Sequence, residues 1–428
     1  MILLKKIYSN IHEHDHALVM VVLGVGLTLL QMLGLFYLFN DHYIDSRAII
    51  NTMNISAPLL CLGFDITSPQ ITKNEKSALF IWNFVFLHLF LALVFFLASF
   101  LISDVKTSYI FLGLVLGAIF SSNLLLNEYE RNINSVKKYF FDLHVRDRFN
   151  RTFFILVIAF IADSIYTWST ILIVLSLAYL SFLIIKYKED IGFDFLKLKK
   201  HLTLSLPFLI TSLVIVFVYR ATFYFSYYLD TSTYAAKIDF WLTISLLLLI
   251  PMMNVSKFAE TSAQGDMGEY IYSLKGGWAK LYQQQRLIIL MIFLLTALGI
   301  YFNKITSIET MTMILPLSLS ILLLTFTPSY LYLALLKNKF SSCLHHVFII
   351  IFLFLFIFSM KVIFLFLPIA WLLLINCFLY LIYTLHFSRV SLNVKIGDIL
   401  RFNDGLKLLS FLILSYLVLF IGTYFAGI

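Results

Sequence analysis

Three ionisable residues within long apolar stretches are the strongest candidates for chemistry in this sequence. Arg220 follows a long apolar run that begins near Leu206 and lies inside the stretch 203–228, while Lys237 and Asp239 stand near the start of the next run. Charged side chains are costly inside a membrane helix, where they face a bundle interior, a cavity or a partner. Arg220 and Lys237 could attract a diphosphate in one cavity, with Asp239 tuning their charge. The alternative is a structural pair of Arg220 with Asp239, with Lys237 reaching outward to water.

Three further residues are weaker candidates for substrate binding or proton handling. Arg47 lies about one turn inside the external end of the second predicted helix, as Lys237 does in the eighth, so each half of the chain places a cation at a corresponding position. Arg47 is therefore a third candidate for substrate binding. Asp163, near the external end of the fifth predicted helix, and His88, within the third, are candidates for proton handling together with Asp239. For Asp163 and His88, a satisfied polar residue is the more common interpretation of such a position.

Metal and nucleotide chemistry find little support in the sequence. Histidines recur between His12 and His16, and residues four apart share a helix face, but the run stops short of a closed ligand set. A solvated start of the first helix is the favoured interpretation. No phosphate-binding loop ending in Gly-Lys-Ser/Thr occurs, which argues against ATP hydrolysis. We expect no metal, no cofactor and no enzymatic activity.

The composition indicates an integral membrane protein. Apolar residues make up 61% of the chain, charged residues only 13%, and the mean hydropathy is +0.94. Soluble domains carry roughly 25% charged residues. Although the net charge is +8, the cations form short clusters between apolar runs, which is how membrane topology is encoded. Lipid headgroups are therefore the expected neighbours, and nucleic acid is not an expected partner.

Apolar runs of about 20 residues match the roughly 30 Å hydrocarbon core of a bilayer and predict an all-α fold. The predicted spans are 17–39, 44–65, 78–101, 108–127, 150–166, 168–186, 203–228, 234–256, 286–302, 311–336, 343–361, 363–386 and 406–427. They form an N-terminal six-helix bundle over 1–200 and a C-terminal one over 201–386. The remainder, 387–428, is predicted as a polar linker and a thirteenth transmembrane helix.

The distribution of Lys and Arg predicts the orientation. With the N-terminus in the cytoplasm, cytoplasmic segments hold 25 of the 31 cations, and the external ones hold Arg47, Lys106, Lys304 and Lys361. Such an excess on the inner side is typical of membrane proteins. An even number of helices in each half gives both halves the same orientation, so the two bundles would be parallel repeats about an axis along the membrane normal.

Short motifs in both halves resemble the multidrug, oligosaccharidyl-lipid and polysaccharide exporter superfamily, in particular its Wzx-type O-antigen flippases. The resemblance is spread over residues 1–386. Gly63, Phe64, Asp65 and Ser68 look like the family's Gly-Phe-Asx stretch, with Gln70 where an arginine is common. In the second half, the matching segments are Ser205 to Pro207 and Tyr234 to Ile238.

The resemblance implies two six-helix bundles around a partly cationic cavity that opens alternately to either side of a bacterial inner membrane. The implied substrate is an oligosaccharide repeat unit linked to undecaprenyl diphosphate, for O-antigen or a similar polysaccharide. A polysaccharide polymerase and a chain-length regulator are candidate partners.

Two other functions remain open. A polysaccharide polymerase or ligase of the same pathway would share the hydrophobicity, although such enzymes generally have a large external loop, which is absent from the predicted topology. A multidrug cation exporter of the same superfamily would place acidic residues, rather than Arg220 and Lys237, in its cavity.

Overall fold

The computed structural model is helical throughout the part of the chain that it describes, apart from short turns. The described residues are 13–39, 42–61, 79–132, 147–186, 222–229, 232–249, 267–301, 306–325, 368–392 and 402–425, with isolated positions within 196–209, 251–255 and 348–362. The chain divides into two compact units, Met1–Ser212 and Leu213–Ile428. The predicted linker and last helix, 387–428, fall within the second unit.

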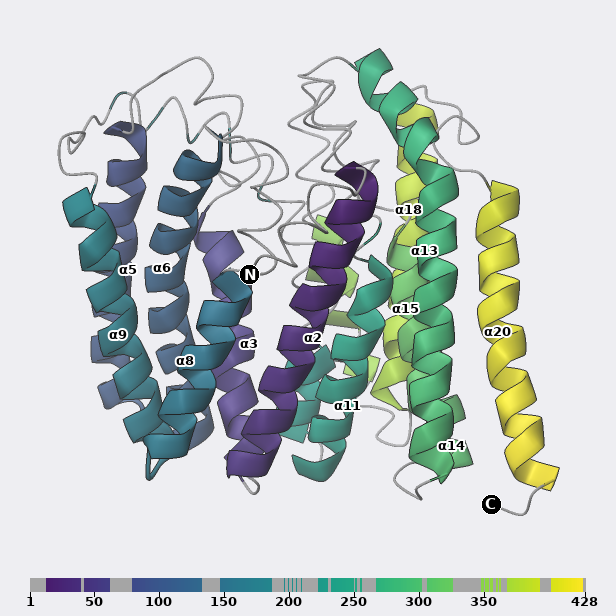
Figure 1. The fold of residues 1–428 in the computed structure, drawn as a ribbon, viewed down its shortest axis with the longest axis horizontal. Coiled ribbons are helices and arrows are strands. Elements are labelled where there is room, and N and C mark those ends of the chain that lie inside the picture. The colour runs from purple at the N-terminus through teal and green to yellow at the C-terminus, as the bar shows by residue number, and fades with distance from the viewer. Residues whose placement is uncertain are drawn as a thin grey trace, which may run out of the picture. The chain divides into compact units, whose positions relative to one another are not determined.

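Unit 1 is a bundle of antiparallel and parallel helices that stand side by side (Figure 1). Its helices are α2 (Glu13–Phe39), α3 (Tyr43–Leu60), α5 (Leu79–Leu101), α6 (Val105–Asn132), α8 (Asp147–Ile161) and α9 (Ile165–Lys186). The turns 102–104 and 162–164 are so short that α5 and α6, and likewise α8 and α9, must run antiparallel. Helix α6 is central because it packs against α3, α5 and α9.

Unit 2 contains straight helices and interrupted ones. The elements are α11 (Ser232–Ser245), the 3₁₀ helix η4 (Leu246–Leu249), α13 (Met267–Tyr301), α14 (Ser307–Glu309), the π-helical turn η5 (Thr310–Ile314), α15 (Leu315–Leu324), α18 (Ile369–Leu392) and α20 (Phe402–Phe425). Helix α15 packs on α18, and α20 packs along α13. The stretches η4 and η5 mark irregular winding within otherwise helical segments.

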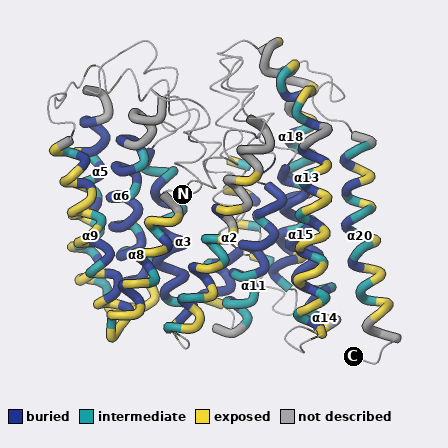
Figure 2. Tube along the Cα trace, viewed as in Figure 1, coloured by how far each residue is buried: buried dark blue, intermediate teal, exposed yellow. Residues whose placement is uncertain are grey.

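The distribution of side chains is that of a membrane protein. Large apolar residues face outward, as Leu101 and Phe160 do at 87% and 80% exposure, and Figure 2 shows exposed residues along the outer faces of α9 and α13. Many of the buried residues, by contrast, are serine, threonine or asparagine. Six of the described helices are long and apolar enough to cross a bilayer, judged by length and composition. The chain is thus a multi-pass membrane protein.

Helices α3 and α6 approach each other closely in unit 1. A Cβ atom placed on Gly113 would lie 2.5 Å from the Cβ of Thr52, and one on Gly117 would overlap the Oγ of Ser56. The two glycines and their two polar partners are each four residues apart, so they form matching stripes along the two helices. Small residues at this spacing let helix backbones approach closely in a membrane.

The predicted span 286–302 placed the start of its helix too late, because α13 begins at Met267. The early part of α13 carries polar residues, which lower its hydropathy below that of a membrane span. Its buried residues nevertheless recur every three or four positions. They include Leu274, Trp278, Leu281, Gln285, Ile289, Ile292, Thr296 and Ile300. Periodicity, rather than hydropathy, identifies this segment as an amphipathic helix.

The prediction of a fifth helix over 150–166 placed its end too late. Helix α8 ends at Ile161, and Ser164 caps the next helix by accepting a hydrogen bond from the backbone N–H of Thr167 at 3.2 Å. A serine at this position satisfies one of the free N–H groups of a helix start. Asp163 therefore lies in the turn between α8 and α9, where it is exposed, and not inside a helix.

Two of the other predicted spans match helices of the structure, and several lie mostly outside the described residues. Helix α20 confirms the helix predicted over 406–427, beginning at Phe402. Helix α18 confirms the one predicted over 363–386, although it begins later, directly after Pro368, and runs on to Leu392. Most of the predicted spans 203–228 and 343–361 and the motif Gly63 to Ser68 lie outside the described residues or hold only scattered described positions. Of the run from His12 to His16, residues 13–16 form the start of α2.

Candidate functional site

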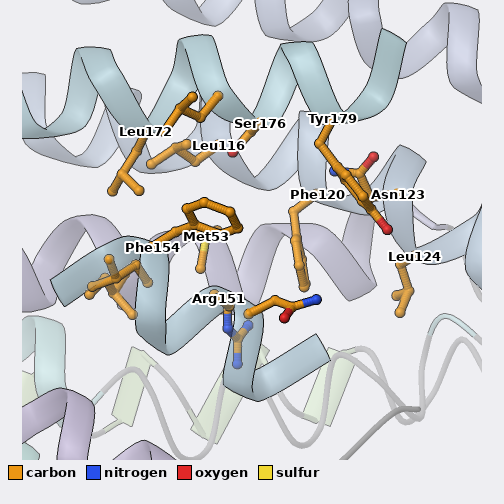
Figure 3. A pocket seen from close by; sticks show the side chains of 14 residues that line it. Met53, Leu116, Phe120, Asn123, Leu124, Arg151, Phe154, Leu172, Ser176 and Tyr179 are labelled. Carbon is orange, nitrogen blue, oxygen red and sulfur yellow. The ribbon is translucent and has the colours of Figure 1, made fainter. Parts of the chain in front are cut away.

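A cavity of about 220 Å³ lies inside unit 1, between α3, α6, α8 and α9 (Figure 3). Aromatic and aliphatic side chains form most of its wall, and amide, hydroxyl and guanidinium side chains project into it from α6, α8 and α9. The lining residues are Ile50, Met53, Leu116, Phe120, Asn123, Leu124, Asn150, Arg151, Phe154, Ile155, Leu172, Leu175, Ser176 and Tyr179. An apolar pocket with a few polar groups is the usual form of a ligand site.

Arg151, in the first turns of α8, is the charged residue of this wall. Its Nη1 donates a hydrogen bond of 3.0 Å to Oδ1 of Asn54 on α3. The guanidinium carbon lies 5.2 Å from the centre of the Phe120 ring, over the face of that ring. Asn54 and Phe120 therefore hold the planar guanidinium from two sides, by a hydrogen bond and a cation–π contact.

Asn123, on α6, contributes a second polar group to the same wall. The residue is 6% exposed, and its Oδ1 has no hydrogen-bond partner among the described residues. A buried polar atom without a partner costs roughly 1–3 kcal/mol. Among the described residues that line the cavity, Arg151 alone is charged, and none is acidic. The cavity thus offers a positive charge, a hydrogen-bond acceptor and aromatic faces.

Arg151 was not among the predicted site residues, because it stands next to a basic loop and resembles the other cations that mark membrane topology. A local signal existed. Arg47, Asn51 and Asn54 recur at intervals of four and three, so they share one face of α3. Arg47 and Asn51 are buried, and Asn54 reaches Arg151. A polar stripe of this kind on an apolar helix marks a face that does not contact lipid.

In unit 2, Lys237 on α11 forms an ion pair with Glu309, with Nζ 2.5 Å from Oε1. The other carboxylate oxygen of Glu309 accepts a hydrogen bond of 3.1 Å from the backbone N–H of Thr306, while Thr306 Oγ1 accepts one from the backbone N–H of Glu309. This reciprocal pattern is a capping box at the start of α14. Glu309 therefore caps its own helix and binds α11 at the same time.

The pKa of Glu309 lies below its ordinary value. Burial on its own would raise the pKa, but the hydrogen bond and charge of Lys237 and the hydrogen bonds of Thr306 favour the ionised form and outweigh that effect. The carboxylate is thus charged at neutral pH. The Lys237 ammonium, at 38% exposure, is matched by this carboxylate.

The structure places the other predicted binding residues as follows. Asp239 is fully buried in α11, two positions from Lys237 and hence on a different side of the helix. Arg220 lies outside the described residues. Arg47 is 2% exposed in α3 of unit 1.

His88, within α5, is held by hydrogen bonds to two neighbouring helices. Its Nε2 lies 2.8 Å from the backbone oxygen of Leu60 at the end of α3, and its Nδ1 lies 3.0 Å and 3.2 Å from the hydroxyls of Ser121 and Ser122 on α6. A carbonyl only accepts, so Nε2 carries a proton. In the neutral ring Nδ1 then accepts from a serine. The contacts describe a satisfied histidine that joins three helices.

Fold and charge distribution together define the class of molecule: a polytopic helical membrane protein with a cavity whose wall carries a cation. Its fold is similar to that of a MATE multidrug transporter, DinF-BH, solved with a bound ligand (TM-score 0.59, 15% identity, 89% of this chain and 96% of that chain). It is also similar to an outward-facing MATE-family multidrug resistance transporter (0.53, 12%, 89% and 95%).

A third similar structure is a transporter of the MOP superfamily from Pyrococcus furiosus, described by the reverse polarity of its binding pocket (0.52, 11%, 89% and 95%). No protein-family model matches the sequence, and no curated protein matches it. The chain thus has a MATE-like fold.

Proposed function

We propose that this protein is a MOP-type transporter that moves undecaprenyl-diphosphate-linked oligosaccharide units from the cytoplasmic to the external face of a bacterial inner membrane. The observation that carries the proposal is the polarity of the cavity in unit 1. Its described wall contains Arg151 and no carboxylate. A guanidinium in a largely apolar wall favours anions such as phosphates and disfavours the lipophilic cations that a drug exporter carries.

The fold supports this proposal. Pocket polarity is a feature that has been linked to a difference of function in a MOP superfamily transporter of similar fold. In the proposed mechanism, the helices of unit 1 shelter the charged headgroup while the lipid tail stays in the bilayer. Outward movement of negative charge is favoured by an inside-negative potential, by about 2.3 kcal/mol per charge per 100 mV.

The test is a flipping assay with purified protein in liposomes that contain an undecaprenyl diphosphate carrying a fluorescent sugar. A membrane-impermeant quencher reports the fraction of labelled lipid on the outer leaflet. With wild-type protein, we expect the quenched fraction to rise from about half toward completeness. Arg151→Ala should slow flipping roughly tenfold, which corresponds to about 1.4 kcal/mol of activation free energy. Arg151→Lys should fall between the two, because it keeps the charge and loses the planar fork.

Lys407→Ala is the matched control. Lys407 is a cation at the surface of α20, 66% exposed and paired with Asp404, so its removal should leave flipping unchanged. Wild-type liposomes that do not flip the labelled lipid but extrude a lipophilic cationic dye would overturn the proposal and favour the drug exporter.

A further inference from the structure

We propose that the cavity of unit 1 is a two-point site for a phosphate ester that carries a neighbouring hydroxyl. Arg151 binds the phosphate, and Oδ1 of Asn123 accepts a hydrogen bond from the hydroxyl. This inference rests on the proposed function and narrows it to one part of the substrate. A sugar attached through phosphate has this chemistry, and so does the glycerol headgroup of phosphatidylglycerol.

The Asn123 amide selects ligands that carry a hydrogen-bond donor. Its Oδ1 is buried and has no partner among the described residues, although the residue belongs to the wall of the cavity. A carbonyl oxygen can only accept, so the group that satisfies it must carry an O–H or N–H. Inorganic phosphate has no hydroxyl apart from those of the phosphate group itself, whereas a sugar or glycerol phosphate has a separate hydroxyl that can donate while its phosphate is bound to Arg151.

The Arg151 guanidinium supplies the specificity for an anion. Asn54 and Phe120 fix the plane of the group at the cavity wall. Arginine presents N–H donors in a rigid fork that matches the oxygens of a phosphate. The ring of Phe120 and the amide of Asn54 are both neutral groups.

The size of the cavity sets the size of the ligand. At about 220 Å³, it is smaller than the roughly 300–1,000 Å³ of pockets for drug-sized ligands. It therefore suits one sugar phosphate rather than a whole oligosaccharide. Phe120, Phe154 and Tyr179 project around it in Figure 3 and offer ring faces against which the C–H face of a sugar can pack.

The experiment is a calorimetric titration of the purified full-length protein in detergent with three probes: a hexose 1-phosphate, glycerol 1-phosphate and inorganic phosphate. We expect the two esters to bind at least tenfold more tightly than inorganic phosphate. Asn123→Leu, which keeps the volume and removes the acceptor, should lower ester affinity to that of inorganic phosphate. Arg151→Ala should abolish the binding of all three, and Lys407→Ala should change none of them.

Equal affinity of the wild-type protein for esters and inorganic phosphate would overturn the proposal, and this comparison does not depend on the folding of any variant. Preference for the hexose ester over the glycerol ester assigns the site to the glycolipid, and the reverse assigns it to phosphatidylglycerol. Flipping without ester binding would defeat this inference and leave the proposed function standing. Ester binding without flipping would support this inference and contradict the proposed function.

Discussion

Glu309 binds Lys237 through one carboxylate oxygen and the backbone of Thr306 through the other, so a single side chain joins α11 to the capped start of α14. The π-helical turn η5 follows directly, and Pro316 stands at the start of α15. Proline and π-helical turns are the usual places where helices bend. The ion pair therefore ties α11 to the end of an interrupted helical segment.

A double-mutant cycle should measure the strength of this pair. Glu309→Gln keeps a capping-box residue and removes the charge, and Lys237→Met removes the partner. We expect a coupling energy of about 0.2–1 kcal/mol from thermal unfolding in detergent, since both side chains are partly exposed. The more exposed pair of Lys407 with Asp404, at 3.7 Å, should give a smaller coupling. Equal couplings would contradict the interpretation that burial strengthens the first pair.

The same pair predicts a dependence on pH. The pKa of Glu309 is lowered in the folded protein, so its contribution to stability is complete above the ordinary glutamate pKa of about 4.3 and is lost as the pH falls through the lowered value. Wild-type protein should therefore lose more thermal stability than Glu309→Gln in the acid range, while the difference between them should be constant at neutral pH. A difference that grows above neutral pH would contradict this assignment.

The contact of Gly117 with Ser56 predicts a large effect for a small substitution. Gly117→Ala should lower stability by roughly 1–3 kcal/mol, because the added Cβ overlaps Ser56 and forces α3 away from α6. Adding Ser56→Gly should recover part of the loss. Gly26→Ala and Gly422→Ala are controls, since a Cβ at either position meets nothing within 4 Å. Both should be neutral or stabilising, as alanine favours helix. The measurement is the midpoint of thermal unfolding.

His88 should act on stability and not on proton coupling. His88→Leu leaves the carbonyl of Leu60 without its imidazole donor, at a cost of roughly 1–3 kcal/mol. We expect a lower unfolding temperature and an unchanged pH profile of flipping in liposomes. A pH profile that becomes flat in this variant would instead support His88 as a proton carrier.

Gln285 should stabilise the irregular end of α11. Its Nε2 donates a hydrogen bond of 3.1 Å to the backbone oxygen of Leu248 in η4. A 3₁₀ pattern would take that donor from residue 251, which is proline and has no N–H. Gln285→Leu should therefore cost roughly 1–3 kcal/mol in thermal unfolding. Gln283→Leu, at an exposed position of the same helix, is the matched control and should have little effect.

The sequence alone determined the membrane class, the helical fold and most helix positions in unit 1. Hydropathy reports the cost of placing each segment in lipid, and this cost is a sum over the segment that needs no knowledge of its neighbours. The summed hydropathy did not predict the first turns of α13, because those turns are polar overall. They are helical with one buried stripe, which includes Leu274 and Trp278. Hydropathy also extended the fifth helix past its end, since Asp163 stands beside an apolar run that a serine cap interrupts.

Only the tertiary structure decided which polar residues meet. Arg151, Asn54 and Asn123 belong to α8, α3 and α6 and are far apart in sequence. Lys237 meets Glu309, which lies 72 positions away and was not among the predicted site residues. Pairings of this kind depend on how helices pack and rotate against one another, and that rotation is set by details such as Gly117 against Ser56. The cost of a charge in a membrane can be read locally, but its partner is a property of the assembled bundle.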